Sequence, residues 1–412
     1  MGAFSFLYDY LRTFENVIVH PAQEMFHPPG TFFRGGPEWP HFAWQTFARH
    51  CWGSIPRPVD SKPFSAQPDW PYFDPRLYSD PQLSSPERWR AMRSLADTEP
   101  HRSDQPVETA DTGLWCGPIT GHFGHMIADF GMRIASSSRI DATTPLVFSF
   151  WPLADAEPPP FFWQILDHLQ VDRSRIMLIR KPTRFARLSV LPQAERRHGG
   201  GPSRRHLRMM DSIAGPPSRS DRDLACVFVS RARLSKGRFA GEAYLDETLA
   251  AAGVTVFHPE AVDLHGQFRL YRRARGLIFS EGSALHALQL LGRLDSDIVV
   301  LTRRPRNRLA EASLRPRAPS LRYLRAARAL IPGSRPDGQP HPPAGISVLD
   351  EQRCLNGMAS LGIALAPFWD PKLYAKRRDA DIDAWMADRL SSATRPEERE
   401  MIEQRLRALS LR

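Results

Sequence analysis

Between residues 224 and 302 the chain alternates short apolar runs with longer amphipathic runs, and this alternation limits the possible folds more than any other feature. The runs "LACVFVS", "VTVFHP", "LIFS" and "DIVVLT" have the length and the content of β-branched and aromatic residues of buried strands. The runs between them, such as "GEAYLDETLAAAG" and "VDLHGQFRLYRRARG", repeat apolar residues at helical spacing. Strands that alternate with helices predict a doubly wound parallel sheet.

A second alternation begins near residue 113, with "GHFGHMIADFGMRIASSS" and "PPFFWQILDHLQ" read as helices and "TPLVFSFW" and "RIMLIR" read as strands. Because 412 residues exceed the size at which one core usually keeps growing, we expect an α/β protein of two domains. The Gly-, Pro- and Ser-rich stretch 192–222 marks the boundary. The predicted parts are 1–215 with long Pro- and Trp-rich loops, 216–365, and C-terminal helices over 366–412 that return to the first domain.

The cysteine and hydropathy patterns favour a cytoplasmic protein. Cys51, Cys116, Cys226 and Cys354 are scattered without metal-type spacing, which is typical of reduced structural thiols. No apolar run approaches the roughly 18 residues of a transmembrane helix, and no secretory signal pattern opens the chain.

Positive charge is concentrated in one part of the chain. The formal net charge is +10, and residues 171–240 carry a large excess of Lys and Arg over Asp and Glu. Nucleic acid, an anionic membrane surface or a phosphorylated small substrate would each suit such a segment. A solvated basic surface that only keeps the protein soluble explains it equally well.

Two of the predicted strand ends carry groups suited to an anion, because ligands of open parallel sheets bind at the carboxyl ends of the strands. The turn after "LACVFVS" carries four cations, Arg231, Arg233, Lys236 and Arg238. The turn after "LIF" carries Ser280, Glu281, Gly282 and Ser283, and a helix is expected to start at Ser283. Cations from one turn and a helix N-terminus from the other favour a diphosphate. The alternative is an ordinary structural turn, with His286 a core-edge residue.

In the first domain "GHFGHMIADF" places His122, His125 and Asp129 on one face of the expected helix, since they are three and four residues apart. A histidine beside a carboxylate can act as a general base or as an oriented hydrogen-bonding pair. A zinc site lacks a fourth ligand and is the weaker interpretation. A helix cap with a polar network is the remaining alternative.

Several common enzyme signatures are missing from the sequence. It contains no G-x-x-x-x-G-K-[ST], G-x-G-x-x-G, G-x-S-x-G or C-x-x-C motif. "DAD" at 379–381 and "DSD" at 295–297 spell a metal-diphosphate pattern. We expect the first to open a C-terminal helix and the second to precede its strand, so that neither lies at the carboxyl end of a strand.

The order "GHFGHMIADF", "VFVSRARLSKGRFAGE" and "VFHPEAVDLHGQFRLYRRARGLIFSEGSALHAL" resembles the family 61 glycosyltransferases. The resemblance covers about residues 113–300. It implies the GT-B architecture, in which two Rossmann-like domains face each other across a cleft, and inverting transfer of a sugar from a nucleotide donor. Similar bacterial members are associated with capsule or other surface polysaccharide synthesis.

On the donor side, the resemblance makes Arg231 a ligand of the donor phosphates and makes Gly282 and Ser283 the turn that cradles the diphosphate. We add Arg238 and His286 to the donor-binding residues. Glu281 stands where the family commonly has His or Gly. A carboxylate would repel the diphosphate, so we expect Glu281 to point toward sugar or ribose hydroxyls, or to mark a bacterial variant.

On the acceptor side, the resemblance implies that either His125 or Asp129 accepts the proton of the acceptor hydroxyl, and we favour Asp129. His122, Glu242 and Gln267 are motif residues to which the sequence assigns no separate role. Gly241 stands before Glu242, where the family usually has Asn.

We therefore expect a metal-independent, inverting glycosyltransferase without a cofactor, which takes a nucleotide sugar as donor and a glycan or lipid-linked glycan as acceptor. Its expected location is the cytoplasm, with peripheral association at the inner face of the membrane as an option and no nucleic-acid partner. The alternative is a non-catalytic basic α/β protein that binds nucleic acid or anionic membrane.

Overall fold

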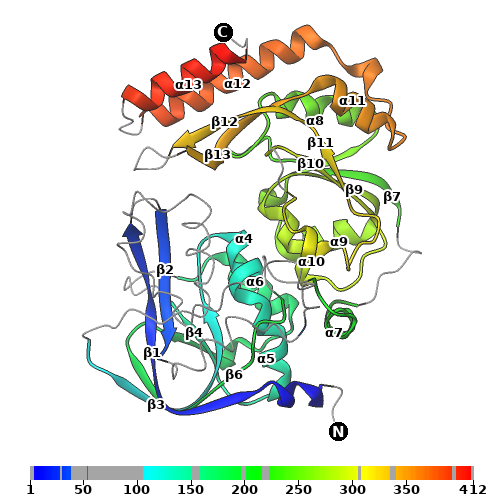
Figure 1. Ribbon diagram of the computed structural model, residues 1–412. Helices are drawn as coiled ribbons and strands as arrows, with labels where there is room; N and C mark the ends of the chain where they lie inside the picture. Colours follow the sequence, from blue (N-terminus) through cyan, green and yellow to red (C-terminus); the bar gives the residue numbers. More distant parts are fainter. Residues whose placement is uncertain are drawn as a thin grey trace, which may run out of the picture. The chain divides into compact units, whose positions relative to one another are not determined.

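The computed structural model describes residues 4–27, 30–38, 53, 105–150, 157–195, 201–215, 222–304, 308–334, 340–391 and 396–409 (Figure 1). The Pro- and Trp-rich stretch that the sequence assigns to ordered loops lies almost entirely outside the described residues. So does Cys51.

The chain divides into two compact units. Unit 1 comprises Met1–Pro216, His286–Arg293 and Ala312–Arg317, and unit 2 comprises the remaining segments, Pro217–Leu285, Leu294–Glu311 and Ala318–Arg412. The predicted division differs in two respects. Two short segments that follow the expected boundary belong to unit 1, and the C-terminal helices belong to unit 2.

Unit 1 is built on a six-stranded mixed sheet with the order β2-β1-β6-β3-β4-β5. Four neighbouring strands are parallel, namely β6, β3, β4 and β5, and β1 and β2 add an antiparallel edge. The strands span Arg12–His27 (β1), Gly30–Pro37 (β2), Glu108–Pro118 (β3), Leu146–Ser149 (β4), Ile176–Ile179 (β5) and Thr183–Val190 (β6). Because β4 and β6 lie on opposite sides of β3, the winding reverses at β3, which is where a ligand site is expected in an open sheet.

The helices of unit 1 follow the predicted pattern with more interruptions. They are α4 (Phe123–His125), α5 (Ile134–Ile140), α6 (Pro160–His168) and α7 (Arg204–Ala214). The single helix expected after residue 121 is divided by a π-helical turn, Met126–Phe130, and a 3₁₀ turn, Gly131–Arg133. On one face of the sheet, side chains of β1, β3, β4, β5 and β6 form a buried cluster around Trp115 and Phe185.

Unit 2 contains a five-stranded, entirely parallel sheet with the order β11-β10-β9-β7-β8. Its strands are β7 (Leu224–Val229), β8 (Thr255–Phe257), β9 (Ala274–Ser280), β10 (Asp297–Thr302) and β11 (Arg322–Arg325). The connecting helices are α8 (Glu242–Ala251), α9 (Leu264–Arg273), a 3₁₀ helix over Ser283–Leu290, and α10 (Glu311–Leu314). The parallel α/β sheet predicted from the alternation is therefore present. Its strand order reverses between β7 and β9.

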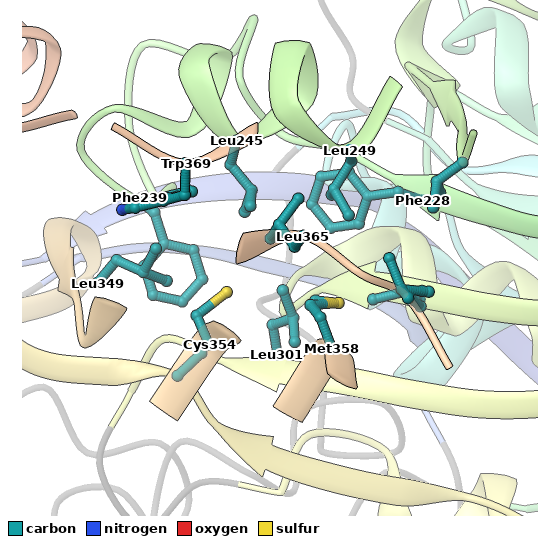
Figure 2. Close-up of a cluster of buried hydrophobic side chains, with 14 of the residues drawn as sticks. Phe228, Phe239, Leu245, Leu249, Leu301, Leu349, Cys354, Met358, Leu365 and Trp369 are labelled. Atoms are coloured by element: carbon teal, nitrogen blue, oxygen red, sulfur yellow. The ribbon is translucent and has the colours of Figure 1, made fainter. Parts of the chain in front are cut away.

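Alternate residues of the strands pack against helices on the two faces of this sheet. Figure 2 shows one face, where Phe228 and Leu301 meet Leu245 and Leu249 of α8 and Met358 of α11 (Glu351–Ala359). All of these side chains are buried. Burial of this kind stabilises the folded state by roughly 1.5–3 kcal/mol for each large apolar side chain. The apolar runs of the sequence are thus explained by burial on both faces.

A hairpin and two long helices complete unit 2. Strands β12 (Ala327–Ser334) and β13 (Pro340–Leu349) pair with each other, and α12 (Pro371–Ser391) and α13 (Pro396–Ala408) pack on them through a cluster that includes Trp385 and Ile402. This burial places the C-terminal helices in unit 2. Among the described residues, no helix is long and apolar enough to cross a membrane.

Candidate functional site

The turn after β7 is clamped by a buried carboxylate. Glu242 is fully buried, and its two carboxylate oxygens accept hydrogen bonds from the backbone N–H groups of Arg231 and Phe239, each at 2.8 Å. Backbone bonds to β13 fix the same loop, since the N–H groups of Gly237 and Ala240 donate to carbonyls of that strand. Glu242 thus shapes the turn and is not a ligand of the donor in this arrangement.

Gly241 has a conformational reason to be glycine. Its φ angle is +75°, in the left-handed region that glycine and asparagine adopt more readily than other residues. An added Cβ would also lie 2.8 Å from a ring carbon of Tyr374. Glycine at 241 therefore meets both the backbone and the steric requirement, and the departure from the family's usual asparagine leaves the turn intact.

Arg231 lies against the bare backbone of the turn after β9. Its Nε donates to the carbonyl of Gly237 at 2.6 Å, and a Cβ added at Gly282 would overlap its guanidinium group. Glycine at 282 is therefore what lets the guanidinium lie across this turn. The predicted convergence of the two turns on one point is present, at the reversal between β7 and β9.

Glu281 has a different environment from the predicted one. It is fully buried, and its carboxylate accepts hydrogen bonds from the backbone N–H groups of Arg303 and Arg304 and from the Arg304 guanidinium. It therefore joins the turn after β9 to the turn after β10. These contacts direct the carboxylate into the protein and not toward sugar or ribose hydroxyls, which corrects the expectation from the sequence.

Arg238 also differs from its predicted role. Its guanidinium forms a two-pronged ion pair with Asp381 of α12, with nitrogen–oxygen distances of 2.5 and 3.2 Å. Asp381 accepts a further bond from the backbone N–H of Gly241. "DAD" thus lies in the middle of α12 and does not open a helix as expected. Asp381, the third residue of this string, connects α12 to the turn after β7.

Arg303, which the sequence reading missed, is a second cation beside Arg231. A Cβ added at Gly237 would lie 3.1 Å from Nη2 of Arg231 and 3.3 Å from Nη2 of Arg303, so both guanidinium groups reach the same point. Burial, followed by the charges of Arg304 and Arg231, lowers the pKa of Arg303 to about 9. Burial likewise lowers the pKa of Arg231. Reading the turn after "DIVVLT" in the way the other turns were read would have found Arg303.

The remaining predicted donor-side residues lie in separate places. Ser283 is partly buried and opens a 3₁₀ helix, where we expected an α-helix. His286 belongs to unit 1, is buried, and contacts Gln289 through Nδ1 at 2.7 Å. Gln267 donates to the carbonyls of Pro259 and Val262, and so it fixes the loop before α9.

A third polar cluster in unit 2 lies at the ends of β7 and β8. Ser230 donates to the carboxylate of Asp246 at 2.9 Å, and Nε2 of His258 lies 3.5 Å from the same oxygen. Burial raises the pKa of Asp246 to about 7 and lowers the pKa of His258. Both groups therefore tend toward their neutral forms.

In unit 1 the predicted histidine dyad is formed at the carboxyl end of β3. Nδ1 of His125 lies 2.5 Å from Oδ2 of Asp129, and the side chains are 44% and 24% exposed. His122 caps the start of α4, with Nδ1 accepting from the N–H of His125. The π-helical turn presents Asp129 one turn beyond His125, and such turns often occur at functional sites.

Gln193, a second residue that the sequence reading missed, supports this dyad from the neighbouring strand. It follows β6, is fully buried, and its amide nitrogen donates to the carbonyls of Asp129 and Phe130 at 3.4 and 3.2 Å. Gln193 lies 64 residues after Asp129 in the chain, so no local sequence pattern links the two residues. Within the described part of the chain, no group of three His, Cys, Asp or Glu side chains is arranged to hold a metal ion.

The part of the chain that contains these features has a family match. Residues 123–292 match the model of the family Glycosyltransferase 61. The match runs from α4 through the Arg231 turn and the Gly282 turn to just beyond the 3₁₀ helix Ser283–Leu290. The match spans less than half of the chain and shows that this segment is similar to that family. A search of curated proteins found no match for the chain.

Proposed function

We propose that the protein is an inverting glycosyltransferase of family 61 that transfers a sugar from a nucleotide-sugar donor to a hydroxyl of a glycan or lipid-linked glycan. The observation that supports this most is Arg231 lying across bare Gly282 where the β7 and β9 turns converge, within the segment that matches the family. A guanidinium beside a turn without a side chain suits the phosphates of a nucleotide donor.

The leaving group is the nucleoside diphosphate. When the bond between the anomeric carbon and the phosphate oxygen breaks, negative charge develops on that oxygen, and Arg231 would stabilise it by electrostatic attraction. The protein's own cations can serve this purpose, so our proposal includes no metal ion or other cofactor. The GT-B architecture, with two Rossmann-like domains, is part of the same proposal.

The acceptor hydroxyl requires a base, and the dyad of unit 1 offers one. The sequence favoured Asp129. The 2.5 Å contact supports another assignment, in which Asp129 orients the ring through Nδ1 and the more exposed His125 accepts the acceptor proton at Nε2. The acceptor oxygen then attacks the anomeric carbon as the diphosphate leaves from the opposite face, and this inverts the configuration.

The basic segment 171–240 offers less support for a polyanion-binding protein than its composition suggested. Several of its cations have carboxylate partners close by: Arg173 pairs with Asp167, Lys181 with Glu108 and Arg238 with Asp381. We therefore propose a nucleotide sugar as partner and no nucleic acid. We keep a cytoplasmic location, peripheral contact with the inner face of the membrane, and a role in capsular or related surface polysaccharide synthesis as parts of the proposal.

A thermal-melt panel against UDP, GDP and CMP tests the proposed function, because a ligand that binds the native state raises the melting temperature. We expect one nucleotide to raise Tm by several degrees in the wild type and not in Arg231→Ala. Arg308→Ala is the matched control, since it removes one exposed arginine paired with Glu311. No response to any nucleotide, together with steeply salt-dependent binding to nucleic acid or anionic vesicles, would favour the non-catalytic alternative.

A further inference from the structure

The guanidinium groups of Arg231 and Arg303 in unit 2 lack a carboxylate partner among the described residues. Arg303 is 3% exposed, and its Nη1 is buried without a hydrogen-bond partner. Within the described residues neither Arg231 nor Arg303 forms an ion pair, although the neighbouring Arg304 and Arg238 do. The nearby acidic groups are engaged elsewhere, because Glu242 accepts from backbone N–H groups and Glu281 from Arg304 and two backbone N–H groups.

These two cations are also held close together. Nη2 of each lies within 3.3 Å of the position that a Cβ on Gly237 would occupy. Each group is fixed by a backbone acceptor, since Nε of Arg231 donates to Gly237 and Nε of Arg303 donates to the carbonyl of Glu281. The pair therefore cannot separate without breaking these bonds. Two like charges held this close repel each other.

A buried cation without a partner destabilises a fold, and two that face each other do so further. Such an arrangement is typical of a site whose missing charge comes from a ligand. The ligand must be an anion with more than one negative charge to balance both groups. Arg231 is only partly buried and can meet this anion, and Arg303 adds a second positive charge beneath it.

We propose that Arg303 is the second cation of the donor-phosphate site and that the Arg231–Arg303 pair together balances the charge of the donor's diphosphate. This inference rests on the proposed function and adds to its donor site a residue outside the segment that matches the family. Arg303 takes the donor-binding role that the sequence assigned to Arg238, because the charge of Arg238 is balanced by Asp381. Charge balance favours the diphosphate, since it carries more negative charge than the phosphodiester of a monophosphate sugar.

The test titrates inorganic pyrophosphate, inorganic phosphate and nucleoside diphosphates into the full-length wild type, Arg303→Met and Arg303→Lys, with Arg308→Met as the matched control. For Arg303→Met we expect opposite effects on stability and binding. Its Tm rises by a few degrees because an unpaired charge is removed. Its affinity for pyrophosphate falls roughly ten- to hundredfold because a charge-assisted contact is lost. Arg303→Lys keeps the charge and most of the affinity, and Arg308→Met binds as the wild type does.

Two results would overturn the inference. The first is that Arg303→Met binds pyrophosphate as tightly as the wild type does. The second is that the wild type binds phosphate as tightly as pyrophosphate, and this comparison does not depend on the folding of any variant. The proposed function can fail separately. If pyrophosphate binding depends on Arg303 and no nucleoside diphosphate binds more tightly than pyrophosphate, the cation pair stands and the nucleotide-sugar donor does not. If nucleoside diphosphates bind tightly and Arg303→Met leaves this unchanged, the function stands and the pair does not.

Discussion

In unit 2 the guanidinium groups of Arg231 and Arg303 are fixed by backbone acceptors and pair with no carboxylate among the described residues, whereas in unit 1 His125 keeps 44% of its side chain exposed and has one short contact to Asp129. The first arrangement holds permanent charge in place. The second holds a group that can gain and lose a proton. The difference matches the two needs of sugar transfer, which are stabilising a departing anion and removing a proton.

The largest expected effect separates the two regions by function. Replacing His125 with Ala should lower the turnover number by roughly 10²- to 10⁴-fold, because the proton acceptor is lost. The affinity for the nucleotide should stay within about twofold, since the proposal gives the dyad no contact with donor phosphate. Steady-state kinetics with a separate titration of the nucleoside diphosphate measure both quantities. If turnover is unchanged in His125→Ala, His125 is not the base. If turnover instead falls by this amount only in Asp129→Asn, Asp129 is the base.

Arg231→Ala should have the converse effect. We expect affinity for the nucleoside diphosphate to fall roughly hundredfold, because about two charge-assisted hydrogen bonds are lost. Calorimetric titration measures the change, with Arg308→Ala as the control for net charge. Equal affinities in Arg231→Ala and the wild type would remove Arg231 from the donor site.

Gly282→Ala tests whether close approach of Arg231 to the turn is required. The added methyl group would overlap the guanidinium and push it away, so we expect roughly tenfold weaker nucleotide binding with a small fall in Tm. Gly276→Ala on the preceding strand, β9, is the matched control, because its Cβ would meet Sγ of Cys226 at an ordinary 3.5 Å. If the two variants bind equally well, the turn does not depend on a bare glycine.

Arg238→Ala should alter stability and leave the site unchanged. It removes a partly buried ion pair that joins the β7 turn to α12 and leaves Asp381 without its partner. We expect a loss of about 1–3 kcal/mol in the free energy of unfolding, measured by denaturant titration, and an unaltered nucleotide affinity. A large loss of affinity at unchanged stability would restore the donor-binding role that the sequence suggested.

Asp246→Asn should have an effect on stability that depends on pH. The folded-state pKa is raised to about 7 by burial, above the unfolded value near 3.9, so the native state binds the proton more tightly. Stability contributed by this proton is present in full below about pH 4 and is lost as pH rises toward 7. The Asn variant should therefore gain Tm over the wild type at pH 8 and none at pH 4. A gain in Tm of the same size at pH 4 and pH 8 would contradict a raised pKa for Asp246.

The sequence predicted well those features that depend on local order along the chain. Alternating strand and helix patterns gave the parallel sheets, and the three- and four-residue spacing brought His125 and Asp129 together. The sequence also indicated that the Arg231 turn and the Gly282 turn converge, because both follow parallel strands.

What the sequence could not predict depends on contacts between residues far apart in the chain. Arg238 pairs with Asp381, which lies 143 positions later, and Gln193 reaches the carbonyl of Asp129 from a different strand. Glu281 lies beside a turn that suits an anion, yet its side chain is buried against the β10 turn. The type of residue indicated possible chemistry in each case, and only tertiary packing decided which partner it met.

The most direct test of the division between donor binding in unit 2 and base catalysis in unit 1 is a parallel calorimetric titration of one nucleoside diphosphate into the wild type, His125→Ala and Arg231→Ala. The predicted result is that His125→Ala binds with the affinity of the wild type, whereas Arg231→Ala shows roughly hundredfold weaker binding. Equal binding by all three proteins, or loss of binding in His125→Ala alone, would contradict the division.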